Sequence, residues 1–373
     1  MAIAVYGMEA TLLGTLLPGF SRVLTPAQGG TIAAAQSLGL IFGSLVTGPV
    51  IDRTGAKAGI ACGLVLIALA LSALPGAHTY IPILLVMSGL GLGGGVISTG
   101  TNTMASAIGG ARRSSMLNLL NVFFGVGGLI TPALGAWLSS RALCFLIVLF
   151  ASATLSFLAL TAVPSRTRRS GEGTAPNGML LRPVFVLLCL FLSLYVATEV
   201  GIWNWLAAYL AGKGIAQSAA LRVLSFGFAA GIIAGRLGAA KILARFDPVR
   251  LTLICAALMA LSTSAILLAH GVGLASVAVF SAGVAMAPVY PTTIGMIGGE
   301  FPRGTATAIG IAVTLGWVGV AGSSKLIGSI AGDDPHRLGT ALLVLPAMSL
   351  LMVGVNLIFS RLPRVSAIAA NPE

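Results

Sequence analysis

Acidic and metal-binding side chains are scarce in this sequence. Its 373 residues include nine Asp or Glu, three His and four Cys. His78, His270 and His336 are far apart, and the cysteines lie singly with no Cys-x-x-Cys spacing. A metal site needs several ligands close together, and a hydrolytic site needs a nucleophile paired with a base. We therefore expect no metal, no cofactor and no enzyme activity.

Charged residues of either sign are also few, and apolar residues replace them. Charged residues make up 8% of the chain, apolar residues 57%, and the mean hydropathy is +1.02. A water-soluble domain cannot bury so much apolar surface, so a lipid bilayer must cover part of it. Runs of about 18 or more nearly uncharged residues are typical of membrane-spanning helices. The sequence predicts an all-α membrane protein with twelve such helices, at 4–21, 30–51, 57–75, 80–107, 114–139, 142–163, 183–211, 218–244, 249–271, 273–299, 304–331 and 338–361.

One polar segment interrupts the apolar pattern. Pro164–Gly178 is rich in Gly, Ser, Pro and Arg, a composition typical of a flexible linker. It separates six predicted helices from six others. We expect an N-terminal six-helix bundle over 1–164, a cytoplasmic linker over 165–181 and a C-terminal six-helix bundle over 182–373. Two similar bundles around a central cavity are typical of transporters that work by alternating access.

The formal net charge of +12 suggests nucleic-acid binding, but the positions of the basic residues argue against it. With a cytoplasmic N-terminus, fifteen of the 21 Lys and Arg residues fall at predicted cytoplasmic ends, five fall at the opposite ends, and Lys325 lies in or at the end of a helix. This asymmetry is the positive-inside bias. We predict a monomeric, multi-pass protein of the bacterial inner membrane with both termini cytoplasmic and no nucleic-acid partner. The fifteen are Arg53, Lys57, Arg112, Arg113, Arg166, Arg168, Arg169, Arg182, Arg236, Lys241, Arg245, Arg250, Arg303, Arg361 and Arg364.

Two basic, glycine-containing segments occupy matching places in the two halves. Gly48–Lys57 reads G-x-x-x-D-R-x-G-x-K, and Gly235–Gly238 follows the eighth apolar stretch. We interpret both as turns. The first resembles the loop-2/3 signature of the major facilitator superfamily, and the six-plus-six pattern extends that resemblance over the whole chain. The resemblance implies the major facilitator fold and a conformational latch at Gly48, Asp52, Arg53, Gly55, Lys57 and Arg236, with Asp52 near the cytoplasmic end of the eleventh helix.

Three further stretches resemble the L-fucose permease branch, the fucose–galactose–glucose:proton symporters. The resemblance implies a sugar-like solute. The two acids usually credited with proton coupling in that branch are missing, because Ser98 and Gly14 occupy their positions. Ion coupling must therefore be argued from other residues. The three stretches are Leu117–Gly127, Tyr195–Trp203 and Tyr290–Thr292.

Two acidic residues lie at membrane depth in the predicted helices. A carboxyl group there is costly and usually faces a cavity or a partner. Glu199 is in the middle of the seventh helix, with Tyr195 and Trp203 four residues away on the same face. This favours coupling of a proton or a sodium ion through Glu199. Glu9 is the second candidate, although its predicted place near a helix end fits snorkelling to the interface equally well.

Amides and aromatic rings at membrane depth are candidates for solute binding. An amide both donates and accepts hydrogen bonds, which suits a hydroxyl-rich solute, and a Trp ring can stack on a sugar ring. Hydrogen bonding between helices is the alternative for each amide. The predicted substrate-binding residues are Gln36, Thr99, Asn102, Asn118, Asn121, Tyr195, Glu199, Trp203, Asn204, Tyr290 and Trp317.

These patterns favour a secondary active transporter of a small, neutral, polar and sugar-like solute, coupled to a proton or sodium. A drug:proton antiporter is the alternative, because Gly128–Ala136 partly resembles the antiporter signature of the fifth helix, with Thr131 and Ala136 in place of two glycines. An uncoupled facilitator also stays open. We do not expect a non-transporting receptor.

Overall fold

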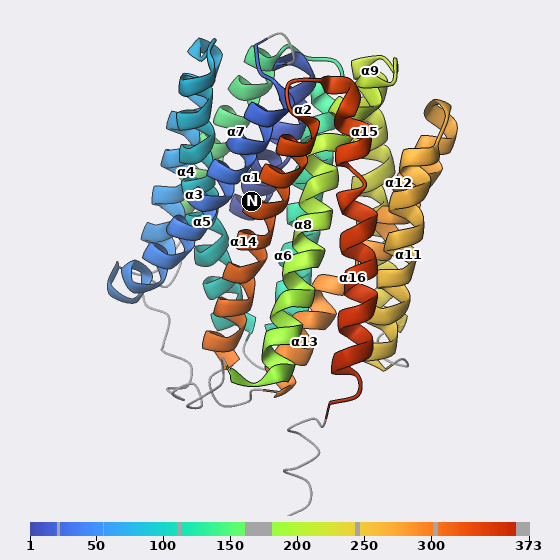
Figure 1. The fold of residues 1–373 in the computed structure, drawn as a ribbon. Helices are drawn as coiled ribbons and strands as arrows, with labels where there is room; N and C mark the ends of the chain where they lie inside the picture. The colour runs from blue at the N-terminus through green and yellow to red at the C-terminus, as the bar shows by residue number, and fades with distance from the viewer. Residues whose placement is uncertain are drawn as a thin grey trace, which may run out of the picture.

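The computed structural model describes residues 1–20, 23–54, 56–109, 113–160, 181–242, 247–300 and 305–362. Throughout these ranges the regular structure is helical, and the long helices run roughly along one common direction (Figure 1). The helices are α1 (Ala2–Ala10), α2 (Leu12–Phe20), α3 (Pro26–Thr54), α4 (Ala56–Ala73), η1 (Leu74–Gly76), α5 (Tyr80–Gly109), α6 (Arg113–Gly135), α7 (Ser140–Leu160), α8 (Pro183–Gly212), α9 (Gln217–Arg222), η4 (Val223–Ala229), α10 (Ala230–Ile242), α11 (Pro248–Leu268), α12 (Gly271–Met286), α13 (Val289–Glu300), α14 (Thr305–Ala331), η5 (Pro335–Arg337), α15 (Leu338–Ala341) and α16 (Val344–Phe359).

The predicted membrane-spanning helices are confirmed. In the described residues, eleven helical segments are long and apolar enough to cross a membrane, and Leu120–Gly135 of α6 is a shorter apolar helix. Several predicted spans are built from two or more consecutive helices. α12 and α13 meet just before Val289, because Pro288 has no backbone N–H to continue the helix. α9 and α10 are joined by the π-helical turn η4.

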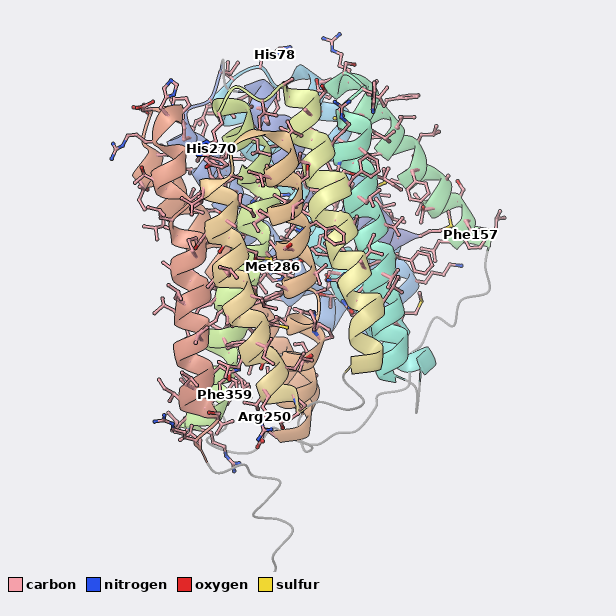
Figure 2. The ribbon with its side chains drawn as sticks, turned by 90° about the vertical axis from the view of Figure 1, so that its right-hand side faces the viewer. His78, Phe157, Arg250, His270, Met286 and Phe359 are labelled. Carbon is pink, nitrogen blue, oxygen red and sulfur yellow. The ribbon has the colours of Figure 1, made fainter. Side chains whose placement is uncertain are left out.

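The two ends of the bundle can be followed in the figures. Arg250 and Phe359 lie at one end and His78 and His270 at the other (Figure 2). We call the first the linker end, because α7 ends at Leu160 and α8 begins at Pro183 on either side of the predicted linker. The second is called the opposite end. Which end faces the cytoplasm stays a prediction.

Most helix packing occurs within each half of the chain. In the first half, α3 and α4 pack on α5, and α1 packs on α6. In the second half, α8 and α11 pack on α16, and α10 and α11 pack on α12. The proposed boundaries at 164 and 182 stay a prediction, since most of the predicted linker lies outside the described residues.

Towards the opposite end, helices from the two halves pack against one another. α3 packs against α14, α2 against α8, and α6 against η4. Ser225 Oγ donates to the backbone O of Leu129 at 2.6 Å, and Lys325 Nζ donates to Thr31 Oγ1 at 2.8 Å. Lys325 is exposed and does not pair with a buried carboxylate.

The segment 48–57 is not the extended turn that the sequence suggested. α3 continues through Gly48, Asp52 and Arg53 to Thr54, and α4 begins at Ala56. The side chains from Gly48 to Thr54, and the whole of Gly55, lie outside what the structure describes. The Nζ atom of Lys57 donates to the backbone O of Ala159 in α7 at 3.3 Å. The latch assigned to this segment therefore stays a prediction.

Candidate functional site

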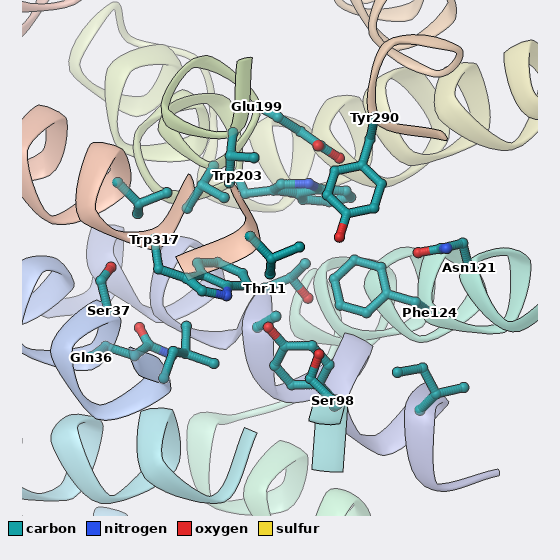
Figure 3. A pocket seen from close by; sticks show the side chains of 18 of the residues that line it. Thr11, Gln36, Ser37, Ser98, Asn121, Phe124, Glu199, Trp203, Tyr290 and Trp317 are labelled. Carbon is teal, nitrogen blue, oxygen red and sulfur yellow. The ribbon is translucent and has the colours of Figure 1, made fainter. Parts of the chain in front are cut away.

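A cavity of about 120 Å³ lies between the two halves of the chain (Figure 3). Its wall is formed by α1, α3, α5 and α6 from the first half and by α8, α10, α13 and α14 from the second. Most of the lining side chains are apolar, aromatic, amide or hydroxyl groups. Two charged residues, Glu199 and Arg236, also line it.

Most of the residues that the sequence assigned to solute binding line this cavity. Tyr195 is fully buried in α8 behind the wall, with its ring 6.5 Å from that of Tyr290. Thr99 is half-buried in α5 and is not part of the wall, and the side chain of Asn118 lies outside the description. Whether the others bind a solute stays a prediction. Those that line the cavity are Gln36, Asn102, Asn121, Glu199, Trp203, Asn204, Tyr290 and Trp317.

Glu199 lies in the middle of α8 and its carboxylate faces the cavity beside Tyr290 (Figure 3). It is close enough to interact electrostatically with the hydroxyl groups of Tyr6, Tyr195 and Tyr290. Trp203 follows one turn later, with its indole packed edge-on against Phe228 at 4.9 Å. No Lys or Arg in the described ranges forms an ion pair with Glu199.

Glu9, near the C-terminal end of α1, lies behind the cavity wall. Its side chain is fully buried, so snorkelling to the interface is the wrong interpretation. Gln36, which does line the cavity, donates from Nε2 to Glu9 Oε1 at 2.7 Å. Glu9 Oε2 and the hydroxyl of Tyr6 are buried without a hydrogen-bond partner. The carboxyl group is thus separated from the cavity by one amide.

Two glycines show why an acidic side chain is accommodated at one position of α1 and α2 and excluded at another. A Cβ atom at Gly94 of α5 would lie 2.8 Å from Glu9 Oε2 and 2.7 Å from a ring carbon of Tyr6, so glycine makes the space for both side chains. A Cβ atom at Gly14 of α2 would overlap the backbone O of Trp203 in α8. The position at which the fucose permease pattern has its helix-1 acid therefore cannot hold any side chain in this structure.

Arg236 is not in a turn, as the sequence suggested, but inside α10, with its side chain in the cavity wall. Its Nη1 atom donates to the backbone O of Asn121 in α6 at 2.8 Å, which joins the two halves of the chain. Its Nε atom is buried without a hydrogen-bond partner. The signal for this placement was present in the sequence, because residue 236 falls within the predicted helix 218–244.

The amide side chains of the cavity wall differ in their hydrogen bonds and burial. Asn102 Nδ2 donates to the backbone O of Ser98 in its own helix at 2.8 Å. Asn204 is buried beside Trp203, and the Nε1 atom of Trp203 has no hydrogen-bond partner. Buried polar groups are nearly always hydrogen-bonded, so an unpartnered donor in a cavity wall calls for an explanation, such as a ligand.

A two-sided helical bundle with a cavity between its halves that mixes apolar, aromatic and polar side chains is the architecture of a membrane transporter. The chain belongs to the Major Facilitator Superfamily, whose family model matches residues 1–324. No curated protein matches the sequence. The chain is therefore a multi-pass membrane transporter of small solutes and not an enzyme.

Solved structures of transporters have the same fold. A D-xylose-proton symporter is 16% identical with a TM-score of 0.82, over 97% of this chain and 96% of that chain. The nucleoside transporter NupG is 14% identical with a TM-score of 0.81, over 96% and 97%. The xylose transporter XylE from E. coli, in a partially occluded inward-open conformation, is 14% identical with a TM-score of 0.77, over 97% of each chain. At these identities the likeness concerns the fold alone, and the L-fucose permease branch stays a prediction.

Proposed function

We propose that the chain is a secondary active transporter of a small, sugar-like solute, which binds in the cavity lined by Glu199 and Arg236 and crosses by alternating access. The observation that carries the proposal is the composition of the cavity wall. Amides supply paired donors and acceptors, and Trp203, Trp317 and Tyr290 supply flat apolar faces. This combination suits a ring that carries hydroxyl groups.

Unpartnered donors in the wall support a hydroxyl-rich solute. Trp203 Nε1 and the hydroxyl of Tyr6 are buried without a partner, and both residues line the cavity. An unmade hydrogen bond of a buried group costs about 1–3 kcal/mol, which a solute hydroxyl recovers on binding. The proteins of the same fold that are named for xylose and nucleoside transport also handle sugar-containing solutes.

The size of the cavity argues against the drug:proton antiporter. A volume of about 120 Å³ is well below the roughly 300–1,000 Å³ of pockets for drug-sized ligands. A small solute is therefore favoured over a large lipophilic cation.

Glu199 is the residue that we assign to ion coupling, with a proton or sodium as the ion. The titratable and charged groups that face it are Tyr195 on its own helix, Tyr290 on α13, Arg236 on α10 and Tyr6 on α1. A carboxyl in the cavity wall that binds an ion in one conformation and releases it in the other links ion movement to the conformational cycle. We propose that the protein works as a monomer in the bacterial inner membrane with cytoplasmic termini.

Thermal unfolding of the purified protein with candidate solutes tests the proposal. A ligand that binds only the folded state, and is present at a concentration 100 times its Kd, stabilises that state by about 2.7 kcal/mol. We expect stabilisation by monosaccharides or sugar acids, and its loss in Trp317→Ala, which removes one face of the cavity. The matched control is Trp137→Ala, because Trp137 is 75% exposed and is not part of the wall. Stabilisation by lipophilic cations alone would contradict the proposal.

A further inference from the structure

Arg236 places a permanent positive charge in the wall of the cavity. Among the described residues that line it, Arg236 is the cationic one, and Glu199 is the acidic one. The two residues do not form an ion pair with each other or with other described residues. The hydrogen bond of Arg236 goes to a neutral backbone carbonyl, that of Asn121. Within the described residues, no carboxylate is therefore ion-paired with the guanidinium, although Glu199 lines the same cavity.

An uncompensated guanidinium at membrane depth is costly. Translocon-based scales assign about 2.5–3.5 kcal/mol to an Arg at the centre of a spanning helix, and such residues usually face a partner or a water-filled cavity. An arginine with a purely structural role would be paired with a carboxylate of the protein. Here Arg236 lines a cavity, and its buried Nε has no hydrogen-bond partner, which points to a ligand that brings its own negative charge.

The geometry of the guanidinium narrows the choice of anion. Nη1 is committed to the carbonyl of Asn121, so the edge formed by Nε and Nη2 is left, and Nε has no partner. This planar edge matches the two oxygens of a carboxylate in a two-bond contact. One guanidinium also balances the single charge of a carboxylate, whereas a phosphate ester carries up to two charges at neutral pH.

We propose that the transported solute is a sugar acid, whose carboxylate binds Arg236 while its hydroxyl groups and ring bind the amides and aromatic residues of the same cavity. This inference rests on the proposed function and specifies its substrate class. It replaces the neutral solute expected from the sequence, because that expectation placed Arg236 in a turn outside the cavity.

A matched pair of ligands tests the assignment. Glucuronate and glucuronamide share the same ring and hydroxyl groups, but only glucuronate carries the negative charge. We expect the purified protein to bind glucuronate at least about tenfold more tightly, as a charge-assisted two-bond contact implies. In Arg236→Gln the preference for glucuronate should disappear, so that the ratio of the two affinities falls to about one. In Arg236→Lys, which keeps the charge without the planar fork, an intermediate preference should remain.

Arg250→Gln is the matched control for the removal of a charge. Arg250 is exposed at the start of α11, at the linker end (Figure 2), so this variant should keep the full preference for glucuronate. Should Arg236→Gln fail to fold, the ligand comparison in wild type and in Arg236→Lys still decides the question.

The outcomes separate the inference from the proposed function. Equal binding of glucuronate and glucuronamide by the wild type overturns the sugar-acid assignment and leaves a transporter of neutral sugars. Tighter binding of glucose 6-phosphate than of glucuronate also overturns it, because the site then prefers phosphate. If sugars, sugar acids and sugar phosphates all fail to bind, the proposed function itself is wrong.

Discussion

Glu9 and Glu199 have the same side chain and both lie near Tyr6, but their surroundings differ. Glu9 is fully buried behind the cavity wall, and one of its oxygens accepts a hydrogen bond from Gln36 at 2.7 Å. Glu199 lies in the wall itself, facing the cavity without an ion-pair partner among the described residues. Of the two acids, only Glu199 lines the cavity.

An acidic residue in a membrane helix therefore cannot be assigned a role from its rarity alone. A carboxyl that exchanges an ion during each cycle must meet water in at least one conformation. Glu199 lines the cavity in the present structure, and Glu9 does not, because Gln36 lies between Glu9 and the cavity. We therefore assign coupling to Glu199, and propose that Glu9 mainly holds α1 against α3.

The strongest test of this comparison is Glu199→Gln. Glutamine keeps the shape and hydrogen bonding of the side chain but cannot ionise. We expect complete loss of solute accumulation against a gradient in proteoliposomes, while exchange of solute across the membrane by counterflow continues. If the variant still accumulates solute, Glu199 is structural. A wild type that accumulates nothing under either a proton or a sodium gradient is a facilitator, and the coupling hypothesis then fails as a whole.

The converse test is Glu9→Leu. This substitution leaves the Nε2 group of Gln36 buried without its partner, so we expect a loss of about 1–3 kcal/mol in the free energy of unfolding. Accumulation per folded molecule should be retained. Glu9→Gln is the control, since its side-chain oxygen can still accept from Gln36 and stability should fall less. Loss of accumulation in both variants, with stability unchanged, would make Glu9 the coupling residue.

The amides sharpen the comparison within the cavity wall. Asn121→Ala should weaken solute binding by about 1–3 kcal/mol if a solute hydroxyl loses its partner. Asn102→Ala is the companion variant, and because Asn102 donates to the backbone O of Ser98 in its own helix, part of its effect should appear as lost stability. Isothermal titration gives the binding loss, and thermal unfolding without ligand gives the change in stability. Equal losses of stability and affinity at residue 121 would show that Asn121 serves to join helices.

Asp52 extends the comparison to an acid outside the cavity. The superfamily resemblance implies that it contacts the start of α14, where free N–H groups favour an anion. We expect Asp52→Asn to weaken the closed conformation at that end by about 0.3–2 kcal/mol. The accessibility of single cysteines introduced at the two ends of the cavity measures this shift. Unchanged accessibility would mean that Asp52 only organises the connection between α3 and α4.

The sequence predicted the fold well because the signal is simple. The length of each apolar run is set by the thickness of the bilayer, so the positions of most helices follow from composition alone. The breaks near Thr11 and Pro288 shift helix ends without changing the number of crossings. The wall residues of α8 were also found, since Glu199 and Trp203 lie on one face by helix periodicity.

The sequence did not reveal the surroundings of Glu9 or the place of Arg236 in the cavity wall. The burial of Glu9 depends on Gly94 and Gln36, which are distant in the chain and show no local pattern. Arg236 follows an apolar stretch and precedes other basic residues, so it has the same sequence context as a basic residue at a helix end. Its role in the cavity depends on the packing of α10 near α6, where the carbonyl of Asn121 holds it. Such contacts between halves carry no periodicity that a single sequence shows.

The movement of ions together with solute tests most directly whether Glu199 couples the two. Proteoliposomes with the wild type, Glu199→Gln or Glu9→Gln receive the solute identified by binding, with a pH-sensitive dye inside and sodium uptake followed in parallel. We expect solute-dependent entry of protons or sodium in the wild type and in Glu9→Gln. We expect none in Glu199→Gln, although that variant still exchanges solute. Solute-dependent ion entry in Glu199→Gln, or its loss in Glu9→Gln alone, would contradict the account.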